Sequence, residues 1–314
     1  MRNVIPTLDL DLYIHGDEAS KSSFIQDVGK TFQNVGFVAI KNHGISKPLI
    51  DTFYAAAKAF FYLETTAKTN YEIPGLAGQR GYTSFGKEHA KQSKAADLKE
   101  FFQIGQVVKG NDSIKESYPD NVYVEEIPSF TQLGDELYAA FETVGNHLLE
   151  AIAIYLNLDP DYFRSRTFNG NSILRAIYYP PIQAEPMSAI RAEQHEDINL
   201  ITLLVGASSG GLELLSKGEW LPVVPENDEI VVNVGDMLQR LTNNYLKSTT
   251  HRVVNPPKEQ WGEERLSIPF FLHPRHTMDL TCLGSCSKNG ASYEPITAGK
   301  YLEERLIEIG LLKP

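Results

Sequence analysis

The stretch QHEDINLITLL, residues 194–204, contains the pattern from which the rest of the chain can be interpreted. His195 and Asp197 lie two residues apart near its start, ahead of an apolar run rich in β-forming residues. This pattern predicts that the pair lies at a strand start or edge, where side chains two residues apart leave the same face. An imidazole and a carboxylate on one face are two of the three ligands in the 2-His-1-carboxylate arrangement that binds non-haem Fe(II).

A third ligand and a binding site for an acid are both found further along the chain. A His-x-Asp pair alone is common by chance, but His251 begins another β-branched run and is followed by a Pro256-Pro257 turn signal. Arg265 and Ser267 then alternate ahead of the apolar run IPFFL, residues 268–272. On one strand face they would form a charge-assisted clamp for a small carboxylate. The combination predicts a co-substrate that is both a chelator and an acid.

Bulk properties exclude several classes of partner. The 314 residues suffice for one large domain or two small ones, and the net charge of -11 argues against nucleic acid or an anionic membrane as the main partner. With only Cys282 and Cys286, a disulfide framework is excluded and a reduced pair is expected. The N-terminus lacks an apolar signal region, and no run approaches the ~20 apolar residues of a membrane span. We therefore expect a cytoplasmic protein that acts on a small molecule.

The order of periodic segments predicts a mixed α/β fold with a mainly β core. Helical spacing occurs over residues 20–34, 47–63, 130–156 and 297–307, and short strands separated by turn residues follow from Asn171. These strands include residues 174–180, 200–205, 230–234, 237–241, 251–254 and 266–273. Their regular spacing predicts a jelly roll, that is, a double-stranded β-helix flanked by helices. We expect an N-terminal helical layer over residues 1–120 and the jelly-roll region over 121–314, within one compact unit.

The glycine-rich stretch from Gly75 to Gly86 is a candidate substrate loop. It lacks the Gly-Lys-Ser/Thr ending of a phosphate loop, so we do not expect it to bind phosphate. Its functional alternative is a loop that brings Arg80 and Tyr82 over a pocket. Arg175 is a further candidate, which either faces the pocket or forms a buried ion pair.

With these motifs in this order, the chain resembles the 2-oxoglutarate-dependent Fe(II) dioxygenases, in the branch that includes isopenicillin N synthase. The matching segments extend over nearly the whole chain and lie at residues 5–6, 36–44, 174–180, 195–197, 241–245, 251–253 and 265–271. The resemblance implies the jelly-roll fold and assigns iron to His195, Asp197 and His251. It also implies that Arg265, Ser267 and Tyr179 bind 2-oxoglutarate. Relatives often have Asn where this chain has Ile177.

The resemblance implies an oxygenase that uses Fe(II), O2 and 2-oxoglutarate to oxidise a small organic substrate by hydroxylation, desaturation or ring closure, with release of succinate and CO2. In such a mechanism no side chain acts catalytically beyond the metal ligands. Two alternatives stay open: an oxidase of the isopenicillin N synthase type, which oxidises a thiol peptide without 2-oxoglutarate, and a non-catalytic jelly-roll binding protein. The substrate and the oligomeric state are not determined by the sequence.

Overall fold

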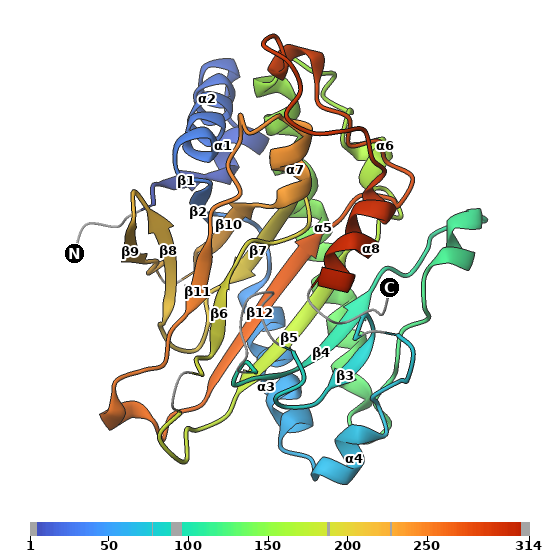
Figure 1. Cartoon of the computed structure of the whole chain (residues 1–314), viewed down its shortest axis with the longest axis vertical. Helices are drawn as coiled ribbons and strands as arrows, with labels where there is room; N and C mark the ends of the chain where they lie inside the picture. Colours follow the sequence, from blue (N-terminus) through green and yellow to red (C-terminus); the bar gives the residue numbers. More distant parts are fainter. Residues whose placement is uncertain (1–4, 77, 89–95, 187–188, 227, 309–314) are drawn as a thin grey trace.

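Two β-sheets form the centre of the protein, which we describe from a computed structural model covering residues 5–76, 78–88, 96–186, 189–226 and 228–308. The larger sheet has eight strands, in the spatial order β1 (Thr7–Asp9), β2 (Phe37–Lys41), β10 (Ile230–Val234), β7 (Ile201–Val205), β12 (Arg265–Leu272), β5 (Ile173–Tyr179), β4 (Glu100–Gly105) and β3 (Gly81–Thr83). The smaller sheet has four, in the order β6 (Ala192–His195), β11 (His251–Val253), β8 (Leu212–Ser216) and β9 (Glu219–Pro222). Neighbouring strands are antiparallel except β1 and β2 (Figure 1). The predicted mixed α/β jelly roll is confirmed.

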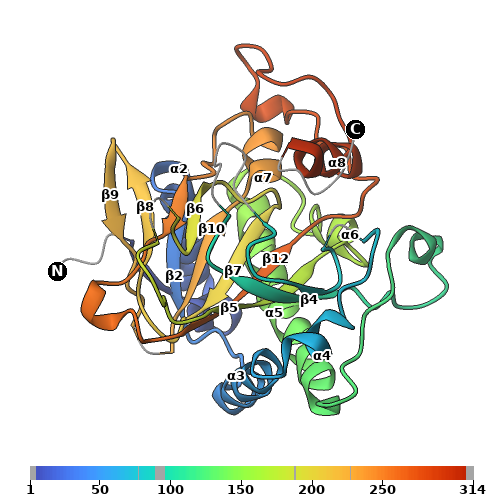
Figure 2. The ribbon, with the colours of Figure 1, turned by 60° about the horizontal axis from the view of Figure 1, so that its bottom comes forward.

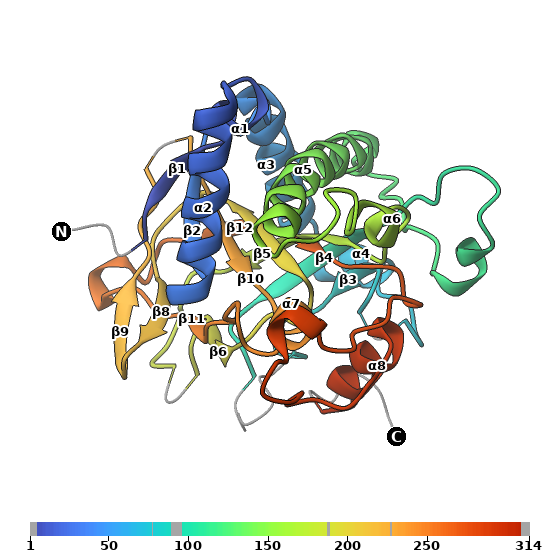
Figure 3. The same ribbon diagram turned by 90° about the horizontal axis from the view of Figure 1, so that it is seen from above.

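Helices cover one face of the large sheet. Seen from above in Figure 3, the helices α2, α3 and α5 lie on one side of this sheet, whereas the small sheet and α8 lie on the other side. The helices are α1 (Leu10–Ile14), α2 (Glu18–Asn34), α3 (Lys47–Phe61), α4 (Thr65–Thr69), α5 (Pro128–Tyr155), α6 (Arg164–Thr167), α7 (Asp236–Leu241) and α8 (Ala298–Glu308). Short 3-10 turns lie at Ser113–Ser117, Lys258–Gln260 and Gly284–Cys286. None of the helices in the described part of the chain has the length and apolar character needed to cross a lipid bilayer.

The long helix α5 supports the sheet because small residues let it approach closely. It begins with proline at its first position, where no intrahelical N–H bond is lost. A Cβ atom at Gly145 would lie 2.3 Å from the side chain of Leu272 on β12. At Gly134 it would lie 2.2 Å from Ile104 on β4. A hydrophobic core fills the space between α5 and this face of the sheet, and Figure 2 shows the helix on that side. Side chains on the opposite face of the sheet line a cavity.

One predicted strand is wrong: residues 237–241 belong to the helix α7. Met237, Leu238 and Leu241 are its buried residues, and their spacing fits one helical face. A run this short does not distinguish strand from helix by periodicity. A second difference concerns His195 and Asp197. His195 ends strand β6, whereas Asp197 lies in the irregular segment that follows and not on the same strand.

Candidate functional site

A cavity of about 860 Å³ lies between the two sheets. Side chains of β4, β5, β7, β10 and β12 line it from the large sheet, and those of β6, β8 and β11 line it from the small sheet. Its volume is within the range of small-molecule sites. Residues from distant parts of the chain thus meet around one cavity.

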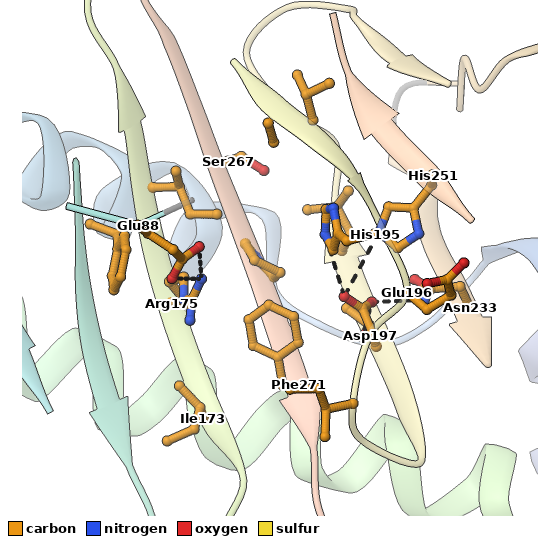
Figure 4. A pocket seen from close by; sticks show the side chains of 18 of the residues that line it. Glu88, Ile173, Arg175, His195, Glu196, Asp197, Asn233, His251, Ser267 and Phe271 are labelled. Atoms are coloured by element: carbon orange, nitrogen blue, oxygen red, sulfur yellow. Dashed lines mark hydrogen bonds and ion pairs between the residues drawn. The ribbon is translucent and has the colours of Figure 1, made fainter. Parts of the chain in front are cut away.

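His195, Asp197 and His251 come together at one side of this cavity. Strand pairing sets His251 of β11 directly opposite His195 of β6, with ring centroids 4.5 Å apart. The Oδ1 atom of Asp197 lies 3.8 Å from the Nε2 atoms of both histidines. All three potential ligand atoms lie within 4.8 Å of one another, so the group could hold a metal ion. Figure 4 shows the three side chains pointing toward one another.

Neighbouring groups leave one donor atom on each of these side chains free. Nδ1 of His195 lies 2.7 Å from the carbonyl oxygen of Glu193, and Nδ1 of His251 lies 3.1 Å from that of Thr249. Because a carbonyl only accepts, each contact places the proton on Nδ1 and leaves Nε2 as a metal ligand. This donor set fits Fe(II).

The carboxylate of Asp197 is oriented by two hydrogen bonds that sequence reasoning missed. Its Oδ2 accepts from the Thr202 hydroxyl at 2.6 Å and from the Asn233 side-chain amide at 2.8 Å, which leaves Oδ1 directed at the histidines. Asn233 could have been noticed as a polar residue inside the buried run IVVNV, residues 230–234. Partners of this kind orient metal ligands in other proteins.

The site favours the protonation states that bind a cation. Burial alone would raise the pKa of Asp197, but the two histidines and the two hydrogen bonds outweigh it and lower the pKa. Burial and the neighbouring His251 lower the pKa of His195. A carboxylate and neutral imidazoles are the forms that coordinate metal.

The strand that carries His195 is tied to the large sheet by Asp97. Strand β6 is the edge strand of the small sheet. One side of β6 pairs with β11, and the other side contacts the segment ahead of β4. There, the backbone N–H of Glu193 donates to Asp97 at 3.1 Å, and Lys99 bridges Asp97 and Glu88 at 2.7 Å each. This network fixes the strand that carries His195 and so helps to position the histidine. The sequence offered no signal for it.

Arg265, Ser267 and Tyr179 line the cavity and are all buried. Arg265 lies opposite Tyr179 in the pairing of β12 with β5, and its Cζ is 5.0 Å from the tyrosine ring centroid. Its Nε donates to the carbonyl oxygens of Ser209 and Gly210 at 3.1 and 3.2 Å. Its Nη1 is buried and finds no partner among the described residues. A buried guanidinium nitrogen in this state has capacity for a carboxylate, which fits 2-oxoglutarate.

The structure places Arg80 and Tyr82 away from the cavity lining, contrary to expectation. The register of β3 with β4 sets Tyr82 opposite Phe102, on the face that packs against the helices, where its hydroxyl donates to Glu100. Arg80 is 1% exposed, and its guanidinium occupies the space over Gly105, where a Cβ would lie 1.8 Å from Cζ. Neither side chain is among the described residues that line the cavity. Glycine content predicted a loop here but not the direction of its side chains.

Arg175 combines the two alternatives that the sequence left open. It lines the cavity and also forms a partly buried ion pair with Glu88 at 3.4 Å. Figure 4 shows this pair separated from the metal-binding group by Phe271.

Comparison with known proteins agrees with this site. Residues 5–126 match the family model described as the non-haem dioxygenase in morphine synthesis N-terminal region, and residues 170–274 match the 2OG-Fe(II) oxygenase superfamily. A 2-oxoglutarate-Fe(II) type oxidoreductase from Metarhizium majus is 31% identical over 96% of this chain and 94% of its own length.

Solved structures give the same result. A putative 2OG-Fe(II) oxygenase family protein from Caulobacter crescentus is 41% identical, with a TM-score of 0.87 and coverage of 98% of this chain and 99% of its own. A Neurospora crassa protein in complex with alpha-KG is 30% identical, with a TM-score of 0.85 and coverage of 96% and 95%. The chain therefore belongs to the 2OG-Fe(II) oxygenase superfamily, as an oxidoreductase that uses Fe(II), 2-oxoglutarate and O2.

Proposed function

We propose that His195, Asp197 and His251 bind the iron, and that Arg265, with Ser267 and Tyr179, binds the carboxylate of 2-oxoglutarate remote from the metal. The observation that carries this assignment is the buried Nη1 of Arg265, which lacks a partner among the described residues and belongs to the same cavity lining as the three potential ligands. An anion at this nitrogen satisfies it, and a chelating group on the same molecule reaches the metal.

When bound, Fe(II) and 2-oxoglutarate together supply the oxidising chemistry for a C–H bond of the substrate. The protein's own residues ligate, orient and exclude water. Thr202 and Asn233 hold the Asp197 carboxylate, and the backbone carbonyls of Glu193 and Thr249 hold the imidazoles. Arg265 orients the co-substrate by a charge-assisted bond inside a buried site, where water competes least.

The substrate is proposed to be a small organic molecule. Relatives support this class: a fungal homologue 32% identical to the chain is named as a proline hydroxylase. The Neurospora crassa protein, in a structure 29% identical to the chain, binds alpha-KG and thymine. The names of the relatives favour a 2-oxoglutarate enzyme over the thiol-peptide oxidase. We also propose a cytoplasmic location, since both cysteines are free thiols.

The assignment is tested by uncoupled turnover. Protein reconstituted anaerobically with Fe(II) is exposed to air with labelled 2-oxoglutarate and no substrate, and succinate and CO2 are measured. We expect slow release in the wild type and a loss of release in Arg265→Ala at limiting 2-oxoglutarate. Succinate production with an unchanged 2-oxoglutarate requirement in this variant would contradict the proposed role of Arg265. No turnover despite bound iron, followed by activity on a cysteine-containing tripeptide, would favour the oxidase alternative.

A further inference from the structure

The cavity has a second end that the co-substrate does not need. Along β12 and just beyond it, the alternate residues Arg265, Ser267, Pro269, Phe271 and His273 all line the cavity. At about 3.3 Å per residue this row is roughly 26 Å long, so its far end is remote from the arginine that we assign to 2-oxoglutarate. Ile173 of β5 lies beside Phe271 in this row. Phe271 is opposite Thr202 of β7, whose hydroxyl donates to Asp197, so this end borders the metal-binding group. It is the space left for a substrate.

Four charged groups, two buried and two partly buried, form a wall along the β4 side of the cavity, and their charges cancel. Lys99, just ahead of β4, lies nearest the Tyr179 and Arg265 end, and Arg175 lies nearest the far end. Two of them are cationic, Lys99 and Arg175, and two are anionic, Glu88 and Asp97. Lys99 contacts both carboxylates at 2.7 Å, and Arg175 contacts Glu88 at 3.4 Å and the side-chain oxygen of Gln103 at 2.8 Å. Burial alone would raise the pKa of Glu88, but Lys99 and Arg175 lower it to about 2, so Glu88 is ionised at neutral pH. A charged substrate would find no uncompensated counter-charge here.

The rim of the cavity also disfavours anions. Glu193, Glu196 and Asp236 line it near the metal-binding group, whereas Arg305 of α8 is the cation on that side among the described lining residues. An entering anion would pass through a field of its own sign.

Hydrogen-bonding capacity is nevertheless available at the far end. His273 is 8% exposed and lines the cavity, and within the described ranges neither of its ring nitrogens has a hydrogen-bond partner. Burial lowers the pKa of His273 to about 4, so its neutral ring offers one donor and one acceptor. The partly buried Asn171 also lines the cavity, and its side-chain Nδ2 has no partner in the same ranges. Buried polar groups are normally paired, so His273 has hydrogen-bonding capacity for a ligand, and Nδ2 of Asn171 is a further donor.

The remaining surface at this end is apolar and partly aromatic. The guanidinium of Arg175 lies 4.2 Å from the ring centroid of Phe101 and 5.2 Å from that of Phe271, so it is held in place by both rings. Ile173 and Pro269 complete the apolar lining. A planar molecule suits such walls better than a branched chain.

We propose that the far end of the cavity, between Arg175 and His273, binds an uncharged planar substrate of the lactam or nitrogen-heterocycle class. His273 forms hydrogen bonds with an edge of this substrate that has both a donor and an acceptor. This inference rests on the proposed function, because it assumes that Arg265 takes the co-substrate. It assigns specificity to residues that the metal and co-substrate do not use.

The test compares probes that differ by one carboxylate. The pairs are thymine against 5-carboxyuracil, and 2-pyrrolidinone against pyroglutamate. Each is titrated anaerobically into protein loaded with Fe(II) and 2-oxoglutarate, and binding is followed by calorimetry and by the shift of the visible Fe(II)–2-oxoglutarate band. We expect at least one neutral member to bind, and to bind about tenfold or more tightly than its anionic partner. No binding by either neutral probe, or equal binding of the anions, overturns the proposal.

Two variants separate recognition from folding. His273→Phe removes the polar ring and should weaken the neutral probe about tenfold or more, while the Fe(II)–2-oxoglutarate band remains. Glu88→Gln leaves the wall with an excess positive charge and should reduce the preference for the neutral probe. The exposed His15, replaced by Phe, is the control. Unchanged probe affinity in His273→Phe contradicts the role of His273. Absence of the band in the wild type would instead contradict the proposed function.

Discussion

Arg265 and Arg175 lie on adjacent strands, face the same cavity and differ in what their guanidinium groups contact. Arg175 is paired with Glu88 and Gln103 and packed between two aromatic rings. Arg265 uses Nε on two backbone carbonyls and keeps Nη1 buried without a described partner. The difference teaches that burial alone does not identify an arginine that binds a ligand. A buried guanidinium nitrogen without a partner does identify such an arginine. Arg265 has one and is therefore assigned a ligand, whereas Arg175 is paired and forms part of the cavity wall.

The largest expected effect comes from removing a proposed metal ligand, Asp197, that lines the same cavity as these two arginines. Asp197→Ala should abolish Fe(II)-dependent turnover of 2-oxoglutarate, because the carboxylate is the only anionic member of the proposed ligand group. Iron content and succinate formation are measured together, and circular dichroism reports folding. Asp112→Asn is a matched control, since Asp112 pairs with Arg275 and does not line the cavity. Turnover by Asp197→Ala with iron still bound would refute the assignment.

Replacing each arginine with alanine tests whether Arg265 binds 2-oxoglutarate and Arg175 does not. Arg265→Ala should raise the dissociation constant for 2-oxoglutarate about 10- to 100-fold, the loss expected for charged hydrogen bonds. Arg175→Ala should leave that constant unchanged and lower stability instead, because Glu88 loses a partner. Anaerobic titration of the Fe(II) protein with 2-oxoglutarate gives the first value, and urea unfolding gives the second. Equal weakening of 2-oxoglutarate binding in both variants would remove the distinction between the two arginines.

A smaller effect should follow from loosening the edge strand that carries His195. Asp97→Asn retains an acceptor for the N–H of Glu193 but loses the charge that pairs with Lys99. We expect about tenfold weaker metal binding, at the low end of the range for groups that orient ligands. A Co(II) absorption titration measures it, and the Asp112→Asn protein provides the reference. Wild-type Co(II) affinity would mean that pairing with β11 alone holds β6 in place.

The smallest effect concerns the pH dependence of the unfolding free energy that the ion pairs of Glu88 cause. Burial alone would raise the pKa of Glu88, but its ion pairs lower it from 4.5 to about 2, so the folded carboxyl binds its proton less readily than the unfolded one. Its stabilising contribution is therefore present above pH 4.5 and is lost as the pH falls toward 2. Unfolding free energies of the wild type should fall more steeply over this window than those of Glu88→Gln. The exposed Glu259→Gln provides the control, and parallel curves for wild type and Glu88→Gln would exclude this contribution.

Local patterns predicted much of the fold because each depends on neighbours in the sequence. The amphipathic spacing of α2, α3 and α5 was recognised nearly to its ends, and the family and its cofactors followed from motifs in order along the chain. Residues 237–241 show the limit of this reasoning. Five residues rich in apolar side chains fit either period, and only the packing of Met237, Leu238 and Leu241 selects the helix. The division of the chain at residue 120 stays a prediction.

The sequence by itself determined which residue types meet the chemical needs of an iron and a dicarboxylate, because strand periodicity places alternate side chains on one face. Only the tertiary structure decided their partners. The pairing of His251 with His195 joins segments more than fifty residues apart. Asn233 reaches the site from β10, and Asp97 from the segment ahead of β4. The register of β3 turned Tyr82 into the core, and the length of β12 carried His273 to the far end of the cavity. Such contacts depend on sheet register and on buried hydrogen-bonding capacity, which local sequence does not encode.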